Sequence, residues 1–218
     1  MELTAFASWL NTFFAEFDRA ILGFYHSLAV AAGNIFTPIA IVFDLIGELG
    51  IFCFLVAIVF LLFAKTRKTG VTIIFAVLFG ALFTNLIIKE AVARPRPFSI
   101  DAEFAAWWQY IGAPHQGKFS FPSGHVTSAM AGMTAIALTR SPKWIAPAAL
   151  YVIIMGATRN YLMVHYPSDV IGGMIVGGVA AVLAVFTVRW LFELMNKNPE
   201  QRFCRFMLYS DIRGTTRK

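Results

Sequence analysis

Residues 170–188 form a run of 19 residues without a charged side chain. A helix that crosses the hydrocarbon core of a bilayer needs about 20 mostly apolar residues, because each residue adds about 1.5 Å along the helix axis. No water is present in that core to satisfy backbone N–H and C=O groups, so a single crossing segment has to be helical. The run therefore predicts a membrane-spanning helix.

Four further segments are predicted to span the membrane: residues 36–64, 70–88, 123–139 and 144–158. The composition agrees, since 58% of the 218 residues are hydrophobic and only 14% are charged. A soluble domain has about a quarter of its residues charged. We therefore predict an all-α fold, a polytopic transmembrane helical bundle with five spans. At this length we expect one membrane-embedded domain, residues 1–218.

Residues 1–35 are expected to form an N-terminal helix that lies in the membrane interface. Bulky apolar side chains recur there at helical spacing among polar ones: Phe6, Trp9, Leu10, Phe13, Phe14 and Phe17 alternate with Asn11, Glu16 and Asp18. Such a pattern is typical of an amphipathic interfacial helix. The alternative is a sixth span over residues 21–43.

Basic residues gather in one set of connections between the predicted spans and in the tail. They are Lys65, Arg67, Lys68, Arg140, Lys143, Lys197, Arg202, Arg205, Arg213, Arg217 and Lys218. By the positive-inside rule this side is cytoplasmic, and residues 197–218 form a basic cytoplasmic tail of a cell-membrane protein. The net charge of +6 thus reports topology and lipid headgroup contact, and it does not indicate a nucleic-acid partner.

Three polar clusters stand at the ends of the predicted spans. They consist of Lys89, Arg94 and Arg96, of Pro122, Ser123, Gly124 and His125, and of Arg159, His165 and Asp169. Five alternating spans put all three clusters on one side, the extracytoplasmic one. Polar groups at membrane depth are costly, so such a concentration indicates a functional site.

The residue types in these clusters suit phosphoryl transfer. Arginine binds phosphate oxygens with two parallel donors, and the N-terminus of a helix adds free N–H groups and positive partial charge. Asp169 follows His165 by four residues, so its carboxylate can accept from one imidazole nitrogen and leave the other free to attack. His125 then remains as the proton donor to the leaving oxygen. A metal site is the rival use of these residues, but it would need more carboxylates than the clusters contain.

These residues resemble the three-part signature of the type 2 phosphatidic acid phosphatase superfamily. The parts are Lys89-(six residues)-Arg96-Pro97, then Pro-Ser-Gly-His at 122–125, then Arg159-(five residues)-His165-(three residues)-Asp169. Family members often have serine before the arginine of the third part, where this chain has Thr158, which keeps the hydroxyl. All three parts occur in order and with fitting separations.

The resemblance implies roles for single residues. His165 would be the nucleophile that forms a phosphohistidine, Asp169 its partner, and His125 the acid for the leaving group. The phosphoryl oxygens would be held by Lys89, Arg96, Ser123, Gly124 and Arg159. The resemblance also implies that no metal and no other cofactor takes part.

Other polar and aromatic residues are expected to play plainer parts. Arg94 is interpreted as an interfacial anchor, with a substrate contact as the alternative, and the ring side chains Trp107, Trp108 and Tyr110 are interpreted as anchors too. Asp44 and Glu48 are expected near the outer interface, with an ion path as the alternative. His26 and His115 are expected outside the site.

The function predicted from these features is hydrolysis of a lipid phosphate or pyrophosphate. Undecaprenyl pyrophosphate ranks first, because that lipid is released on the outer face where the site is expected. Phosphatidylglycerophosphate or phosphatidic acid ranks second, and phosphate transfer to another lipid ranks third. From another class of protein, a transporter with an anion-binding site is the alternative. The oligomeric state is left open.

Overall fold

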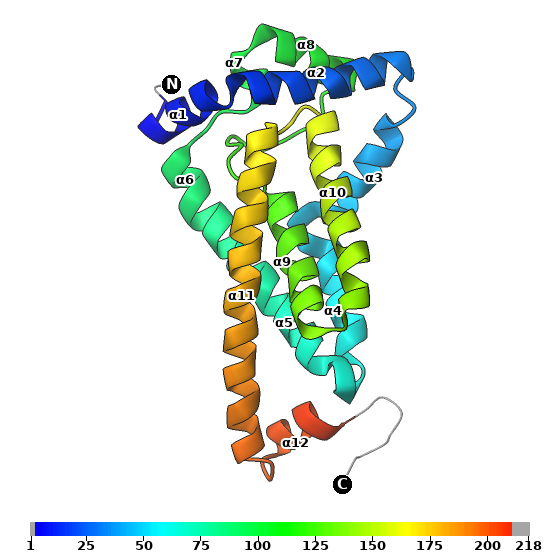
Figure 1. Cartoon of the computed structure of the whole chain (residues 1–218), viewed down its shortest axis with the longest axis vertical. Helices are drawn as coiled ribbons and strands as arrows, with labels where there is room; N and C mark the ends of the chain where they lie inside the picture. Colours follow the sequence, from blue (N-terminus) through cyan, green and yellow to red (C-terminus); the bar gives the residue numbers. More distant parts are fainter. Residues whose placement is uncertain (1–2, 211–218) are drawn as a thin grey trace.

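The chain folds into a bundle of long helices that is crossed at one end by shorter ones (Figure 1). The computed structural model describes residues 3–210. The bundle consists of α3 (Thr37–Gly47), α4 (Ile51–Leu61), α5 (Ala64–Ala81), α9 (Gly124–Thr139), α10 (Ile145–Tyr161) and α11 (Pro167–Lys197). Among the described residues no strand is present, so the prediction of an all-α fold is confirmed.

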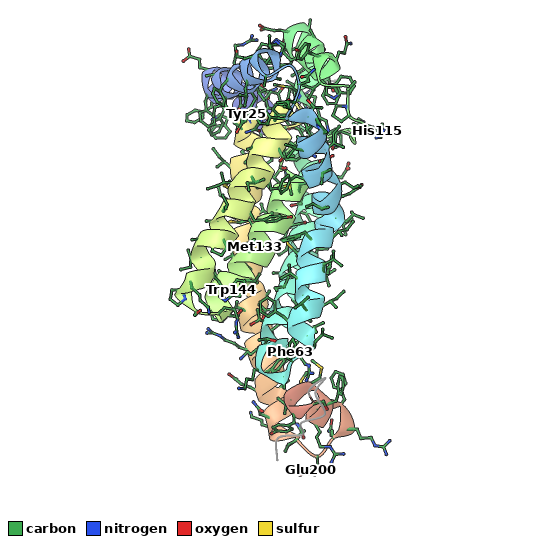
Figure 2. The ribbon with its side chains drawn as sticks, turned by 90° about the vertical axis from the view of Figure 1, so that its right-hand side faces the viewer. Tyr25, Phe63, His115, Met133, Trp144 and Glu200 are labelled. Atoms are coloured by element: carbon green, nitrogen blue, oxygen red, sulfur yellow. The ribbon has the colours of Figure 1, made fainter. Side chains whose placement is uncertain are left out.

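Short helices complete the two ends of the bundle. At one end lie α1 (Ala5–Phe13), α2 (Ala15–Ala31), α6 (Lys89–Val92), α7 (Pro97–Ile100) and α8 (Ala102–Tyr110), while α12 (Arg202–Tyr209) lies at the other (Figure 1). Short connections are η1 (Glu48–Gly50) and η3 (Pro142–Trp144), while the π-helical η2 (Leu82–Ile88) joins α5 to α6 within one helical stretch. Figure 2 places Tyr25 and His115 at the crossed end, and Phe63 and Trp144 toward the opposite end.

All five segments predicted to span the membrane are helical, but they differ in length. Three helical stretches, Thr37–Leu61, Ala64–Val92 and Pro167–Lys197, are long and apolar enough to cross a bilayer, the first with a kink at Leu49 and Gly50. The helices α9 and α10 have 16 and 17 residues, which corresponds to about 25 Å each. They fall short of the roughly 30 Å of the hydrocarbon core.

The outward faces of the bundle are apolar. Large exposed hydrophobic side chains project from four of its helices: Leu55, Ile58, Leu78, Leu150, Ile153, Ile175 and Phe186. In contrast, α9 packs against α5, α10 and α11 and is largely buried. A surface of this kind is suited to acyl chains, and it explains the excess of apolar residues in the composition.

The N-terminal segment crosses the end of the bundle and does not continue its axis. The helix α2 ends at Ala31 and α3 begins at Thr37, with Gly33 and Asn34 in the left-handed region between them (φ 57° and 63°). Residues 21–43 are therefore two helices of different direction (Figure 1), and the alternative of a sixth span over them is wrong.

The C-terminal segment is more ordered than a solvated tail. Arg67, which is buried, donates to the backbone carbonyls of Phe206 at 2.8 Å and of Ser210 at 2.7 Å. These carbonyls lie at the end of α12, where the last turn of a helix leaves its C=O groups unpaired. The predicted basic tail over residues 197–218 thus contains a helix, α12, that contacts the bundle, while Arg213, Arg217 and Lys218 lie outside the described residues.

Candidate functional site

The three polar clusters meet at the end of the bundle that α2 crosses. Lys89 begins α6, Arg96 stands in extended backbone just before α7, and Ser123 is the N-cap of α9. Arg159 lies in the last turn of α10, and Asp169 in the first turn of α11. The structure therefore brings together all the residues that the signature singles out.

His165 and Asp169 form a buried pair in the connection from α10 to α11. The Nδ1 atom of His165 lies 3.4 Å from Oδ2 of Asp169, and that oxygen also accepts from the backbone N–H of Tyr166 at 2.9 Å. Pro167 begins α11, which places Asp169 where a carboxylate caps the first turn. The cap holds the carboxylate on one side of the imidazole.

The other edge of His165 faces positive charge. Its Nε2 atom lies 3.3 Å from Nη1 of Arg96. The same Nη1 atom of Arg96 also donates to the carbonyl of Val164 at 2.6 Å. Burial lowers the pKa of His165 well below its usual range, and the charges of Arg96, Arg159 and Lys89 lower it further. Burial also lowers the pKa of Arg96 to about 10, against the attraction of Asp169, so Arg96 remains a cation at neutral pH.

The start of α9 contributes polar groups beside Lys89. A Cβ atom on Gly124 would lie 3.8 Å from Nζ of Lys89, so the ammonium sits directly over the first turn of the helix. The hydroxyl of Ser123 is buried and has no hydrogen-bond partner within residues 3–210. The N–H of Ser123 is different, because it donates to the carbonyl of Asp169 at 3.1 Å. The start of α9 was expected to offer free N–H groups, and this is wrong for the N–H of Ser123; the hydroxyl is the unpaired group.

Arg159 and His125 share a carboxylate that belongs to none of the three clusters. Asp44, in α3, pairs through Oδ1 with Nη1 of Arg159, and the same oxygen lies 3.3 Å from Nε2 of His125. Arg159 is fully buried and also donates to Oε1 of Gln116 at 2.8 Å. We expected Asp44 only to lie near the outer interface, and no sequence motif indicated its place in the site. An acid in an otherwise apolar run was the signal that could have found it.

Arg94 is also part of the site's framework. It is fully buried, and it pairs with Asp169 at 2.7 Å and with Asp18 of α2 at 2.9 Å. Ser168 joins the same network by donating its N–H and its hydroxyl to Asp18, at 2.8 and 2.6 Å. The interpretation of Arg94 as an interfacial anchor is therefore wrong.

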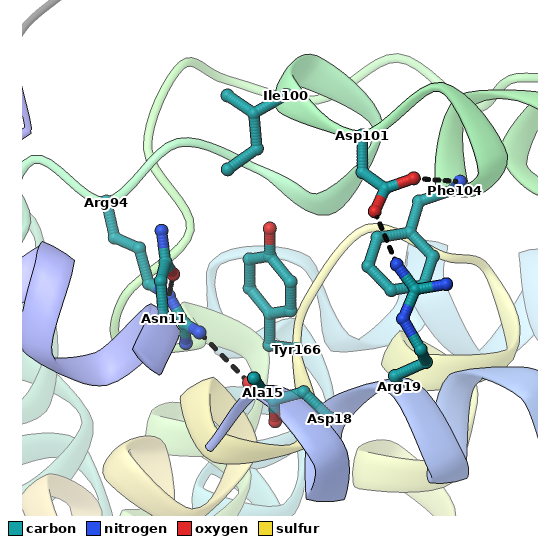
Figure 3. Close-up of a pocket in the computed structure, with 9 residues that line it drawn as sticks. All are labelled: Asn11, Ala15, Asp18, Arg19, Arg94, Ile100, Asp101, Phe104 and Tyr166. Carbon is teal, nitrogen blue, oxygen red and sulfur yellow. Dashed lines mark hydrogen bonds and ion pairs between the residues drawn. The ribbon is translucent and has the colours of Figure 1, made fainter. Parts of the chain in front are cut away.

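The network borders a pocket of about 200 Å³ between α2 and α8 (Figure 3). The ring of Tyr166 stands in this pocket, with the guanidinium of Arg94 stacked 3.9 Å from its centroid. Burial lowers the pKa of Arg94, but attraction by Asp169 and Asp18 outweighs this and raises it above the ordinary value. Arg94 therefore stays positively charged, and it contacts Asp169 on the side away from His165.

The tryptophans interpreted as interfacial anchors also make tertiary contacts. Trp107 stacks on His26 of α2, with ring centroids 4.8 Å apart, and Trp108 stacks on Phe98 at 4.2 Å. Both rings pack α8 against its neighbours, whereas Tyr110 remains 42% exposed.

Comparison with known proteins identifies the family. The chain is 31% identical over 126 residues to an undecaprenyl-diphosphatase of Sulfolobus acidocaldarius, an alignment that covers 57% of this chain and 58% of that protein. It is 36% identical over 117 residues to a lipid A 1-phosphatase of Rhizobium johnstonii, covering 52% and 46%. A phosphatidylglycerophosphatase B of Bacillus subtilis is 30% identical over 142 residues, covering 60% and 63%.

The chain thus spans between about half and two thirds of the length of these relatives, and no solved structure gives a significant match. The model of the PAP2 superfamily matches residues 69–193, which are more than half of the chain and contain all three polar clusters. The chain therefore belongs to the PAP2 superfamily.

Proposed function

We propose that the protein is an integral membrane lipid phosphatase that works through a phosphohistidine on His165. The observation that carries the proposal is the setting of the His165 ring. One nitrogen faces the carboxylate of Asp169 and the other faces the cation Arg96, next to Lys89 and the start of α9. A neutral imidazole held in this way presents a lone pair toward the place where a phosphate would bind.

In the first step the lipid phosphate binds to Lys89, Arg96, Arg159 and the groups of Ser123 and Gly124. Nε2 of His165 attacks phosphorus, while Asp169 accepts from Nδ1 and stabilises the charge that forms on the ring. The bond from phosphorus to the leaving oxygen breaks, and His125 gives that oxygen a proton. The surrounding cations stabilise the charge on the transferring group.

In the second step water attacks the phosphohistidine. His125, now neutral, takes a proton from the water, the phosphorus–nitrogen bond breaks, and inorganic phosphate leaves. The enzyme returns to its starting state, so the cycle uses no metal or cofactor. The cationic side chains supply the charge stabilisation that a metal ion supplies elsewhere.

Undecaprenyl pyrophosphate is the substrate we rank first. The relative from Sulfolobus acidocaldarius is an undecaprenyl-diphosphatase, and so is a relative from Bacillus subtilis that is 32% identical over 104 residues. The basic residues Lys65, Lys68 and Lys143 are close in sequence to Phe63 and Trp144, which lie toward the end of the bundle opposite the site (Figure 2). By the positive-inside rule, the end that contains the site faces the extracytoplasmic side of the cell membrane.

Phosphatidylglycerophosphate is the second candidate, supported by the phosphatidylglycerophosphatase B of Bacillus subtilis among the relatives. Phosphatidic acid, or transfer of the phosphate to a second lipid, would use the same first step. An anion-binding transporter would use the cations but would not need the His165–Asp169 pair.

The test is phosphate release by detergent-purified protein from undecaprenyl pyrophosphate, phosphatidylglycerophosphate and phosphatidic acid, each with EDTA. We expect release that is abolished in His165→Ala and unchanged in His115→Ala, a matched control on an exposed histidine of the long loop. The ranking of kcat/KM among the three lipids identifies the substrate. Folded protein that releases phosphate from none of them would overturn the hydrolase and favour the transferase or the transporter.

A further inference from the structure

Asp44 lies outside the three clusters, yet its side chain contacts two of their members. Its Oδ1 atom pairs with Arg159 and lies 3.3 Å from Nε2 of His125. Its backbone carbonyl lies 3.1 Å from the same imidazole nitrogen. The helix α3 therefore engages His125 through two separate oxygens of one residue.

The approach of α3 to these residues depends on Gly47, one turn after Asp44. A Cβ atom at Gly47 would lie 2.4 Å from Cε of Met155 in α10 and 3.2 Å from Cδ2 of His125. A larger residue there would have to displace the flexible end of Met155 and would press on the ring of His125. Because Cδ2 is bonded to Nε2, the edge of the ring that faces α3 is the one that Asp44 contacts, and Nδ1 is the nitrogen left for another partner.

The two oxygens of Asp44 have different effects on a general acid. The backbone carbonyl can only accept, so it places a proton on Nε2, and the nearby carboxylate favours the doubly protonated ring, which has to exist before a proton can be given away. The cations Lys89 and Arg96 disfavour such a ring, and an anion beside His125 acts against their effect. The contact mirrors the one at His165, where Asp169 faces Nδ1 at 3.4 Å.

We propose that Asp44 is a positioning residue for His125: it holds Nε2 so that Nδ1 gives its proton to the leaving oxygen. The proposal rests on the phosphatase mechanism described above. In the first step the phosphorus–oxygen bond breaks and the proton moves from Nδ1 to the leaving oxygen. Nε2 keeps its hydrogen bond to the backbone carbonyl of Asp44, and the carboxylate of Asp44 stays beside it. In the second step Nδ1 takes the proton back from the attacking water. The site then contains two histidine–aspartate pairs, one for the nucleophile and one for the acid.

A different role for Asp44 would be to occupy the phosphate position on Arg159 until substrate displaces it. The two roles differ in one measurable respect. Loss of an acid's partner slows only reactions whose leaving group needs a proton, whereas loss of a placeholder tightens phosphate binding for every substrate.

The test compares Asp44→Asn with the unaltered protein on two phosphate monoesters, an alkyl phosphate and 4-nitrophenyl phosphate. The alkoxide needs a proton to leave, and the nitrophenolate does not. We compare kcat/KM, which reports the steps up to phosphoenzyme formation. General acid catalysis contributes about 10²- to 10⁴-fold, so we expect the alkyl ester to lose about 10- to 100-fold and the aryl ester less than about 3-fold.

Three controls accompany the comparison. Glu48→Gln removes the same charge one turn further along, at an exposed position, and leaves both rates unchanged. His125→Gln shows the same selective loss, and adding Asp44→Asn to it costs nothing more, because the two residues act as one unit. Should Asp44→Asn fail to fold, Asp44→Ser carries the same comparison.

The proposal would be overturned if Asp44→Asn lowered kcat/KM equally for both esters. It would also be overturned if Asp44→Asn lowered the Ki for inorganic phosphate and its effect on kcat/KM did not depend on the leaving group. Failure of the phosphatase mechanism itself gives a different result. In that case the unaltered protein releases no phosphate from either ester, or His165→Ala retains the activity.

Discussion

Arg94 donates from Nη1 to Oδ1 of Asp169 at 2.7 Å, while the other oxygen of that carboxylate faces His165. The carboxylate is thus held from behind by a fully buried guanidinium, which a second acid, Asp18 of α2, neutralises from the far side. The orientation of His165, the proposed nucleophile, therefore depends on Asp18, a residue of the N-terminal segment that none of the three polar clusters contains.

Replacing Arg94 should damage both stability and turnover. Arg94→Met leaves Asp18 and Asp169 buried without a counter-charge, and breaking a buried pair in this way costs about 3–5 kcal/mol. Arg94→Lys keeps the charge, but a single ammonium cannot reproduce the separate contacts to Asp18 and Asp169. We expect Lys to be intermediate, with a lower kcat and an unchanged Ki for phosphate. Thermal unfolding in detergent and steady-state kinetics measure both effects.

The matched control for Arg94 is Arg19, which also pairs with two acids, Asp101 and Glu103, but is half exposed. Exposed pairs contribute less than about 1 kcal/mol, so Arg19→Met should leave the unfolding temperature and kcat nearly unchanged. Equal effects of Arg94→Met and Arg19→Met would show that burial of the network has no special importance.

The lowered pKa of His165 makes a prediction about pH. A histidine whose pKa is depressed stays neutral, and therefore nucleophilic, until the pH falls below the ordinary value of about 6.5. The acid limb of kcat/KM should accordingly have its midpoint below that value. The acid limb could reflect protonation of His165 or of the substrate phosphate. Two substrates with different phosphate pKa values distinguish these causes, because the midpoint pH is the same for both substrates if His165 titrates and differs between them if the substrate titrates. A midpoint at or above pH 6.5 with both substrates would contradict the buried, cation-flanked setting.

Close packing of α9 on α11 predicts contrasting effects at two neighbouring glycines. A Cβ atom at Gly177 would lie 2.5 Å from the carbonyl oxygen of Thr127, whereas one at Gly178 would meet only the tip of Met130, at 3.8 Å. Gly177→Ala must move one backbone against the other, and overpacking of this kind costs about 1–3 kcal/mol. Gly178→Ala should be neutral or slightly stabilising, because alanine favours a helix. Unfolding temperatures of the two variants, measured side by side, test the difference.

At the opposite end of the bundle, Arg67 should control the docking of α12. Arg67→Met removes the donors to Phe206 and Ser210, so α12 should detach and trypsin should cut faster after Arg202 and Arg205. Lys65→Met, an exposed basic neighbour, should leave the cleavage rate unchanged. Phosphatase activity should be unaffected by either variant, since the site lies at the other end (Figure 1). Unchanged cleavage in Arg67→Met would mean that other contacts hold α12.

Local properties of the sequence determined the class of fold and the composition of the site. The apolar runs predicted the bundle helices because helix length and apolar content are properties of a single segment. The positions of the three polar clusters at the ends of those helices predicted that Lys89, His125 and His165 would meet. Their assigned roles remain predictions that the experiments above test.

Only the tertiary structure decided which charges are paired. Asp44 and Arg94 each stand in an apolar or interfacial stretch, and their partners are 75 or more residues away in the chain, so no local pattern joins them. The same holds for Asp18, whose helix was predicted from periodicity but whose contact with Ser168 depends on how α2 crosses the bundle. The energy of a buried charge depends on the groups that surround it in space. Those groups are fixed by the packing of helices, which the spacing of residues along one helix does not determine.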